Sequence, residues 1–367
     1  MTDYEDPTTF DRGFYESLSP NDQDRFEDDF KHNLSDFDAS AIKRTLKAEY
    51  DRQDEHLKLV KATSACFHVR GGVATNSGFK LYGVNPLCGI HETQADIVAV
   101  NNEHNCVYLL IVFCEIGGER MDEWVKNVNE AHRFFSKPET KDALRQKLNI
   151  NTRDIEIGYV TLTREDDTVG MDFSILSRQC DANPYAVWEC DTGDRWIRHV
   201  EGSLPHPDLE SEFASDLDYS RRKEPINFIS GTHPIFPLER NILKIVSENK
   251  TFNTDPIDEF DRDTFLDFHS DELKVFCTSN NEDAVKEAEA DRILSAGVNS
   301  RILTDKPSEL EEGDYKVVYS GARGPEHAKN AVEPRYFKYM PQYEVGKRAF
   351  KKTKDEFNKS SGLSDFV

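Results

Sequence analysis

The segment from Cys106 to Cys114, CVYLLIVFC, most constrains the fold, because it is almost wholly apolar. A strand of this composition is normally buried on both faces, at the centre of a sheet that helices cover. The segment is far shorter than the roughly 20 apolar residues that a membrane-spanning helix needs. It therefore predicts a central β-strand in an α/β domain.

The segments around this strand predict the rest of a sheet. Residues 40–59 have apolar side chains at helical spacing without an interrupting Gly or Pro, and residues 119–135 have the same pattern until Pro138 stops it. The polar turn NNEHN joins the central strand to the strand before it. The order helix, strand, hairpin, helix, strand predicts a mixed central sheet flanked by helices. The further strands are expected at 79–84, 95–100, 155–163, 185–190 and 195–200.

The length of 367 residues exceeds what one hydrophobic core usually organises, so two domains are expected. Three helices followed by two short strands in the second half suit a winged-helix module, although other small α+β domains share that order. The predicted divisions are an acidic N-terminal arm at 1–38, the sheet domain at 39–202, a Pro-containing linker at 203–230, a small α+β domain at 231–334 and a basic, aromatic segment at 335–367. The helices of the small domain are expected at 238–249, 258–268 and 282–296, and its strands at 301–303 and 315–319.

The net charge of −23 comes from 69 acidic and 46 basic residues, and the acids are spread along the chain. This composition favours a protein adapted to a salt-rich cytoplasm, because concentrated salt screens the self-repulsion of such a chain. An ordinary acidic protein is the alternative. The N-terminus lacks the basic start and apolar stretch of a signal peptide, and the seven Cys include no CxxC pair. A cytoplasmic location with reduced thiols and no membrane contact is expected.

Two carboxylates are expected at one end of the predicted sheet. Asp96 opens one apolar strand, and Glu115 closes the next one. Mg²⁺ prefers oxygen ligands, and it can activate a water and neutralise charge on a phosphate. Side chains alternate along strands, so the two acids share a face only if the hairpin has an odd register, with Asp96 opposite a residue such as Ile111, or if a bulge intervenes. In an even register the two acids point apart, and Glu92 becomes the nearer partner of one of them.

This pattern resembles the restriction-endonuclease-like family with its PD-(D/E)XK signature, read here as Ala95-Asp96 and Glu115-Ile116-Gly117. The resemblance implies a nuclease-type sandwich with Mg²⁺ or Mn²⁺ bound by Asp96, Glu115 and an acid of the upstream helix, which carries Glu49 and Glu55. We select Glu55 as that third ligand. Gly117 stands where the family has its catalytic Lys, so the resemblance implies a replacement. Lys126 is the first candidate for the replacement lysine, so the predicted catalytic residues are Asp96, Glu115 and Lys126. Lys80 is the second candidate. The alternative interpretation of Lys126 is a solvated lysine on the surface of its helix.

The local net charge of the chain becomes positive near its end. Residues 335–359 are rich in Lys and Arg interleaved with Tyr and Phe, a composition that suits backbone and base contacts to nucleic acid. The seven-residue spacing of Phe350 and Phe357 equally suits an amphipathic helix with both rings packed inward. The predicted nucleic-acid-binding residues are Arg335, Lys338, Lys347, Arg348, Lys351 and Lys352.

These observations favour a nucleic-acid-processing protein that hydrolyses phosphodiesters with a metal, acts on DNA and serves in defence against foreign DNA; the biological setting follows from the fold resemblance alone. One alternative is a nuclease-fold subunit that binds nucleic acid or assembles with partners without catalysis, which Gly117 favours. A third class is an assembly protein that docks a partner through its acidic N-terminal arm. The other interpretation of that arm is a solvated acidic face whose Phe side chains pack against the main domain.

Overall fold

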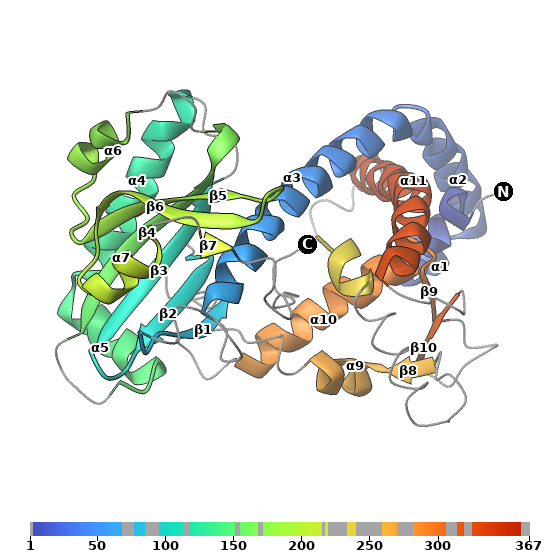
Figure 1. Cartoon of the computed structure of the whole chain (residues 1–367). Helices are drawn as coiled ribbons and strands as arrows, with labels where there is room; N and C mark the ends of the chain where they lie inside the picture. Colours follow the sequence, from blue (N-terminus) through green and yellow to red (C-terminus); the bar gives the residue numbers. More distant parts are fainter. Residues whose placement is uncertain are drawn as a thin grey trace. The chain divides into compact units, whose positions relative to one another are not determined.

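The computed structural model describes residues 3–67, 77–84, 95–113, 118–150, 155–167, 172–214, 217–218, 233–239, 259–269, 282–305, 314–318 and 325–360. The chain forms two compact units, which Figure 1 shows. The sheet unit comprises residues 52–232 and 266–289. The helical unit comprises residues 1–51, 233–265 and 290–367. Helix α3 (Ala39–Cys66) begins in the helical unit and ends in the sheet unit.

A seven-stranded mixed sheet forms the centre of the sheet unit, with its strands in sequence order. The first three strands form an antiparallel meander, β4 and β5 each lie parallel to the strand before them, and β6 and β7 are antiparallel again. The strands are β1 (Lys80–Val84), β2 (Ile97–Asn101), β3 (Cys106–Phe113), β4 (Glu156–Arg164), β5 (Tyr185–Asp191), β6 (Trp196–Ser203) and β7 (Leu217–Asp218).

Helices cover both faces of this sheet, because its strands are apolar on both sides. Ile97 and Ala99 of β2 lie in one core with Leu59 and Cys66 of α3. Val98 and Val100 lie in the other core, with Trp124 and Val128 of α4 (Gly118–Phe135) and Leu144 of α5 (Pro138–Lys147). The predicted α/β architecture, with a mixed sheet between helices, is therefore confirmed, and the central strand is buried as its composition requires.

The chain after β6 differs from the predicted linker at 203–230. It forms helix α7 (Pro207–Glu212) and the short strand β7. Leu204, Leu209 and Phe213 are buried in the core that contains α3. Pro207 occupies the first turn of α7, where a missing backbone N–H costs nothing, so the prolines here start a helix rather than a linker. Residues 219–232 lie outside the described residues.

The helical unit contains a small three-stranded antiparallel sheet in the order β8-β10-β9. The predicted hairpin strands pair as β9 (Leu303–Thr304) and β10 (Asp314–Val317), and the predicted helix at 282–296 is α10 (Glu282–Asn299). The predicted helix at 258–268 begins later, because residues 259–261 pair with β10 as β8 (Glu259–Asp261) and α9 (Arg262–His269) follows. Of the predicted helix at 238–249, residues from 240 onward lie outside the described residues.

Both ends of the chain belong to the helical unit. Helix α2 (Pro20–Leu34) packs along α11 (Pro325–Ser360), with α1 (Arg12–Ser17) against the same cluster. Phe26 and Phe30 of α2 are fully buried against Phe350 and Phe357 of α11. The acidic arm and the basic C-terminal segment are therefore parts of one core, which differs from the predicted division into separate end segments.

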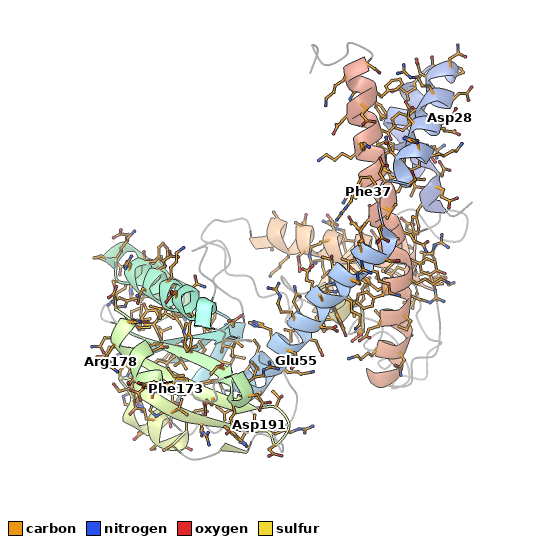
Figure 2. The ribbon with its side chains drawn as sticks, turned by 90° about the horizontal axis from the view of Figure 1, so that it is seen from above. Asp28, Phe37, Glu55, Phe173, Arg178 and Asp191 are labelled. Carbon is orange, nitrogen blue, oxygen red and sulfur yellow. The ribbon has the colours of Figure 1, made fainter. Side chains whose placement is uncertain are left out.

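The charged side chains of the N-terminal arm lie on the outside of this core. Asp24, Asp28 and Asp29 of α2 are exposed, and Figure 2 shows Asp28 on the helix that runs beside α11. This arrangement favours the interpretation of the arm as an acidic face held by Phe side chains. Among the described residues, no helix is long and apolar enough to cross a membrane.

The acidic surface predicts a strong salt response. The protein has a net charge of −23. Raising KCl from about 0.1 M to about 2 M shortens the Debye length from roughly 10 Å to below about 3 Å, which screens the repulsion between its acids. The melting temperature should therefore rise by more than the few degrees that an ordinary acidic protein gains. Differential scanning calorimetry across this range measures it. The double variant Asp28→Asn/Asp29→Asn should melt higher in dilute salt and gain less from KCl. A flat or falling melting temperature for the unmodified protein would contradict the interpretation.

Candidate functional site

The candidate site lies at the end of the sheet where β2 begins and β3 and β4 end, which we call the Asp96 edge. Helix α3 packs on this sheet through Leu59, Val60 and Ala62, which places the preceding turn of the helix at that edge. Glu55 and His56 belong to this turn, and Figure 2 shows Glu55 where α3 reaches the sheet. The residues that meet here come from elements far apart in the sequence.

Asp96 occupies a bend directly before β2, and both oxygens of its carboxylate are bound. Oδ1 lies 2.8 Å from Nε2 of His56, and Oδ2 accepts a hydrogen bond of 2.7 Å from the backbone N–H of Val112 on β3. The side chains remain 20% exposed for Asp96 and 32% for His56, so solvent and ligands reach the pair. The two contacts hold the carboxylate in one orientation at a half-buried edge.

The hairpin register satisfies the condition set by the sequence, but the bend changes its consequence. Ile97 pairs with Leu110, so a regular strand would place Asp96 opposite Ile111 and on the α4 side with Val98. The bend at Asp96 instead lets its carboxylate reach His56 on α3. Glu115 lies outside the described residues, as does Gly117.

Glu55 is held by cations on both oxygens. Oε2 lies 3.0 Å from Nη1 of Arg164, the last residue of β4, and Oε1 accepts a hydrogen bond of 2.6 Å from Lys58. The hydrogen bond to Glu55 raises the pKa of the Lys58 ammonium, so the lysine stays charged. A metal ion bound by Glu55 would have to compete with both cations. The contacts of Glu55 instead link α3 to β4 through its ion pair with Arg164.

A second group of charges lies on β5, β6 and the turn that follows β4. Glu189 of β5 is only 5% exposed, and Arg198 of β6 donates to its Oε2 at 2.9 Å and to Oε1 of Glu165 at 3.2 Å. The buried hydroxyl of Thr163, which is paired with Glu189 in the strand register, has no hydrogen-bond partner within the described part of the chain. The sequence prediction missed this group, although a lone Glu inside the apolar run YAVWEC was a usable signal.

Lys126 lies on the solvent side of α4. Its side chain is 69% exposed, and its ammonium lies 3.9 Å from Glu130, one turn further along the helix. Asn129 and Arg133, three and seven positions after Lys126, make other contacts: Asn129 binds the backbone of residues 179 and 181, and Arg133 lies 3.2 Å from Asp181. The alternative candidate Lys80 is exposed on β1. The placement of Lys126 therefore fits a solvated helix lysine.

The basic residues of α11 fall into two groups. In the second half of the helix, Lys352 lies 2.6 Å from Asp36 and Arg348 lies 3.9 Å from Glu344, so acids balance these charges, while Lys351 is exposed. Around the middle of the helix, two cations flank two aromatic rings at four-residue spacing. Arg335, Tyr339, Tyr343 and Lys347 form this row.

Cations lie close to the aromatic rings of this row. Arg301 lies 4.6 Å from the ring centre of Tyr339, Lys338 lies 4.8 Å from the same ring, and Lys347 lies 5.9 Å from that of Tyr343. Hydrogen bonding from Lys338, with the charges of Arg301 and Arg335, lowers the pKa of the Tyr339 phenol. This shift reports a locally positive field on a chain whose net charge is strongly negative.

The described donors do not by themselves complete a metal site. Within the described ranges, no three His, Cys, Asp or Glu side chains cluster as metal ligands. The oxygen donors of the edge are the type that Mg²⁺ takes, but Glu55 is bound to cations, which leaves Asp96 with His56. A divalent metal here would therefore need further ligands from residues outside the described ones.

The chain matches no known protein family, no curated protein and no solved structure.

Proposed function

We propose that the protein processes nucleic acid, and that its sheet unit is a nuclease-type domain with metal-dependent phosphodiester hydrolysis at the Asp96 edge. The observation that carries the proposal is the order α3, β1, β2, β3, α4, β4, with an antiparallel meander followed by a parallel strand. In this order Asp96 directly precedes the second strand, and Glu115 follows the end of the third. The PD-(D/E)XK resemblance implies acids at these two positions.

The residues of this edge have separate roles in the proposed reaction. Asp96 and Glu115 would hold Mg²⁺ or Mn²⁺, and the metal would supply an activated water and neutralise charge on the phosphate. His56 and the backbone N–H of Val112 orient the Asp96 carboxylate, as second-layer hydrogen bonds commonly do for metal ligands. Glu55 and Arg164 fix α3 to β4, so the ligand geometry depends on this ion pair.

Nucleic acid, with DNA as the favoured form, would lie against residues 335–347 of α11. The row Arg335, Tyr339, Tyr343 and Lys347 has cations at its ends for phosphate contacts and the ring of Tyr339 between them for stacking, while the ring of Tyr343 packs against Tyr4 and Phe10. The winged-helix interpretation of the helical unit belongs to the same proposal, because a helix pair between β8 and the β9–β10 hairpin is compatible with that module. A role in defence against foreign DNA remains part of the proposal.

The second candidate is a subunit of the same architecture that binds nucleic acid without cleaving it. Gly117 stands in place of the lysine, and Lys126 forms a surface pair with Glu130 instead of a buried contact. Titration of the protein with Mn²⁺ by calorimetry in 1 M KCl, together with a DNA cleavage assay, separates the two candidates. Stoichiometric Mn²⁺ binding with cleavage supports the enzyme, whereas DNA binding without either supports the second candidate.

Replacement of Lys126 tests the proposed migrated lysine. Because its ammonium is largely solvated, we expect Lys126→Met to change the melting temperature little and to leave cleavage within about twofold, since exposed ion pairs contribute at most about 1 kcal/mol. The assay is cleavage at saturating Mn²⁺, with Glu130→Gln as the matched control for loss of the pair. A large loss of cleavage in Lys126→Met alone would instead assign the catalytic lysine to this position.

A further inference from the structure

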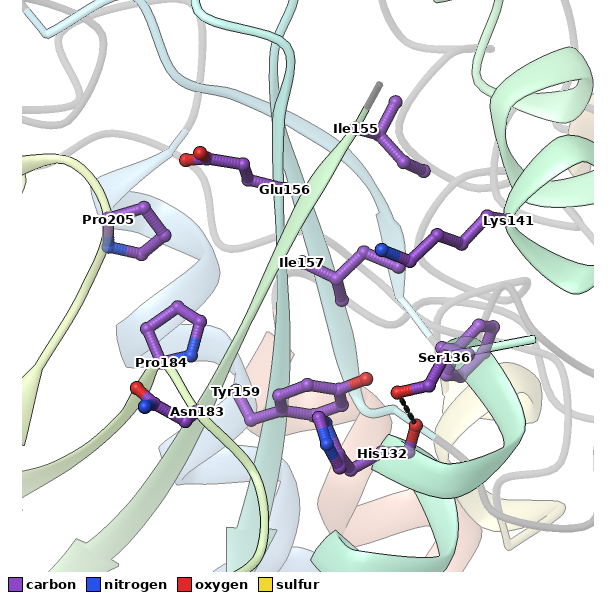
Figure 3. A pocket seen from close by; sticks show the side chains of 11 residues that line it. His132, Ser136, Lys141, Ile155, Glu156, Ile157, Tyr159, Asn183, Pro184 and Pro205 are labelled. Carbon is purple, nitrogen blue, oxygen red and sulfur yellow. Dashed lines mark hydrogen bonds between the residues drawn. The ribbon is translucent and has the colours of Figure 1, made fainter. Parts of the chain in front are cut away.

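A cavity of about 260 Å³ opens at the other end of β4 from the Asp96 edge. Helices α4 and α5 form one wall, β4 forms the floor, and the segment before β5 closes the side (Figure 3). Tyr159 is the lining residue of β4 that lies nearest to the Asp96 edge, and it is four positions before Thr163, which corresponds to roughly 13 Å along the strand at about 3.3 Å per residue. The cavity is therefore separate from the proposed nuclease site and does not depend on it.

The floor of the cavity presents two polar groups. Tyr159 is 2% exposed and meets the imidazole of His132 edge to face, with ring centres 5.5 Å apart. Nδ1 of His132 is buried and forms no hydrogen bond with the described part of the chain. Burial raises the pKa of the Tyr159 phenol and lowers that of His132, so at neutral pH the phenol keeps its proton and the imidazole is uncharged. A buried nitrogen without a partner beside a cavity is a group that a ligand could satisfy.

The charge at the cavity comes from Lys141 of α5. Figure 3 shows its ammonium turned inward toward Ile157, and within the described ranges it forms no ion pair. The neighbouring acid Asp142 lies 3.4 Å from Arg145 instead. Glu156 also lines the cavity, but on the opposite side of β4, where its Oε2 lies 3.9 Å from the thiol of Cys106. One side of the cavity is thus positive and the other negative.

The remaining walls combine the apolar residues Phe135, Ile155, Ile157, Pro184 and Pro205 with the polar residues Ser136 and Asn183. Pockets for larger ligands have volumes of about 300–1,000 Å³, so this cavity suits a molecule of roughly ten heavy atoms. We propose that the cavity binds a small monoanionic carboxylate with an apolar body, its carboxylate paired with Lys141 and its body against the apolar walls near Tyr159 and His132. Glu156 disfavours a second negative charge, which selects a monoanion over a dianion such as a phosphate monoester.

Calorimetric titration of the full chain with benzoate at constant KCl tests this proposal. We expect benzoate to bind with a dissociation constant of about 1 mM or below, and benzamide, its neutral analogue, at least about tenfold more weakly. Lys141→Met should weaken benzoate binding about tenfold or more while leaving benzamide unaffected. The matched control Lys137→Met removes a lysine that stacks on Phe134 and does not line the cavity, and it should bind benzoate normally.

Several outcomes would overturn the proposal. They are absence of benzoate binding, equal affinity for benzoate and benzamide, unchanged affinity in a folded Lys141→Met protein, and tighter binding of inorganic phosphate than of benzoate. Lys141→Gln, which removes the charge but keeps a polar side chain of similar length, provides a second variant if Lys141→Met melts at a lower temperature. It should weaken benzoate binding while leaving Mn²⁺ binding at the Asp96 edge intact, because the two sites lie at opposite ends of the strands.

Discussion

Phe350→Ala should lower the free energy of unfolding of the helical unit by about 3–5 kcal/mol, the usual cost of truncating a buried Phe. The ring is 6% exposed and lies within ring-stacking distance of Phe10, Phe14 and Phe26, with centroid separations of 5.9, 6.1 and 5.4 Å. A small domain has only about 5–15 kcal/mol of total stability, so this loss is a large share of it. Urea denaturation followed by circular dichroism measures the change.

Lys351→Ala is the matched control for this prediction, because Lys351 is the next residue of α11 and is exposed. It should change the free energy of unfolding by no more than about 0.5 kcal/mol. The pair of variants also distinguishes the two interpretations of the C-terminal segment. A stable Phe350→Ala protein with weakened DNA binding would favour a segment that uses its rings on nucleic acid, and would contradict the packed helix.

The sequence predicted the sheet well, because its signals are local. Cys106–Phe113 is recognisable from its own composition, and β2 and β4 from theirs. Where prediction failed, the deciding interactions were distant ones. α5 begins at Pro138, which the sequence suggested only as the end of α4, and α7 follows prolines that suggested a linker. The union of the two chain ends rests on Phe26 meeting Phe350, which no local periodicity specifies.

The candidate site shows the same division. Asp96 was identifiable because an acid before a buried strand has a recognisable place in a sheet. Its contact with His56, 40 positions earlier in the chain, was not, because no spacing pattern connects a helix residue to a strand end that distant. Glu55 was predicted as a metal ligand because it lies on the upstream helix, but the position of β4 pairs its carboxylate with Arg164. Sequence thus located the edge, and tertiary contacts determined which carboxylates there have charged partners.

Asp96→Asn should reduce DNA cleavage by at least about a hundredfold, which corresponds to about 2.7 kcal/mol in the activation barrier. Even outer hydrogen-bond partners of metal ligands typically change affinity or activity by 10–100-fold, so loss of a charged ligand should do at least as much. The substitution preserves shape. Asn retains an oxygen that can accept from the N–H of Val112, and its amide can face His56, so the melting temperature should change little. Glu115→Gln should also abolish cleavage while leaving folding and nucleic-acid binding nearly intact.

Asp54→Asn provides the matched control for Asp96→Asn. It removes a carboxylate from the same region of α3, but Asp54 lies 3.1 Å from Lys58 and is not a contact of Asp96. We expect it to cleave DNA and bind Mn²⁺ as the unmodified protein does, whereas Asp96→Asn should lose stoichiometric Mn²⁺ binding in calorimetry. Full cleavage by a folded Asp96→Asn protein would remove this edge as the reaction site. Absence of both cleavage and Mn²⁺ binding in the unmodified protein, with DNA binding retained, would instead identify the His56–Asp96 pair as a structural link between α3 and the start of β2.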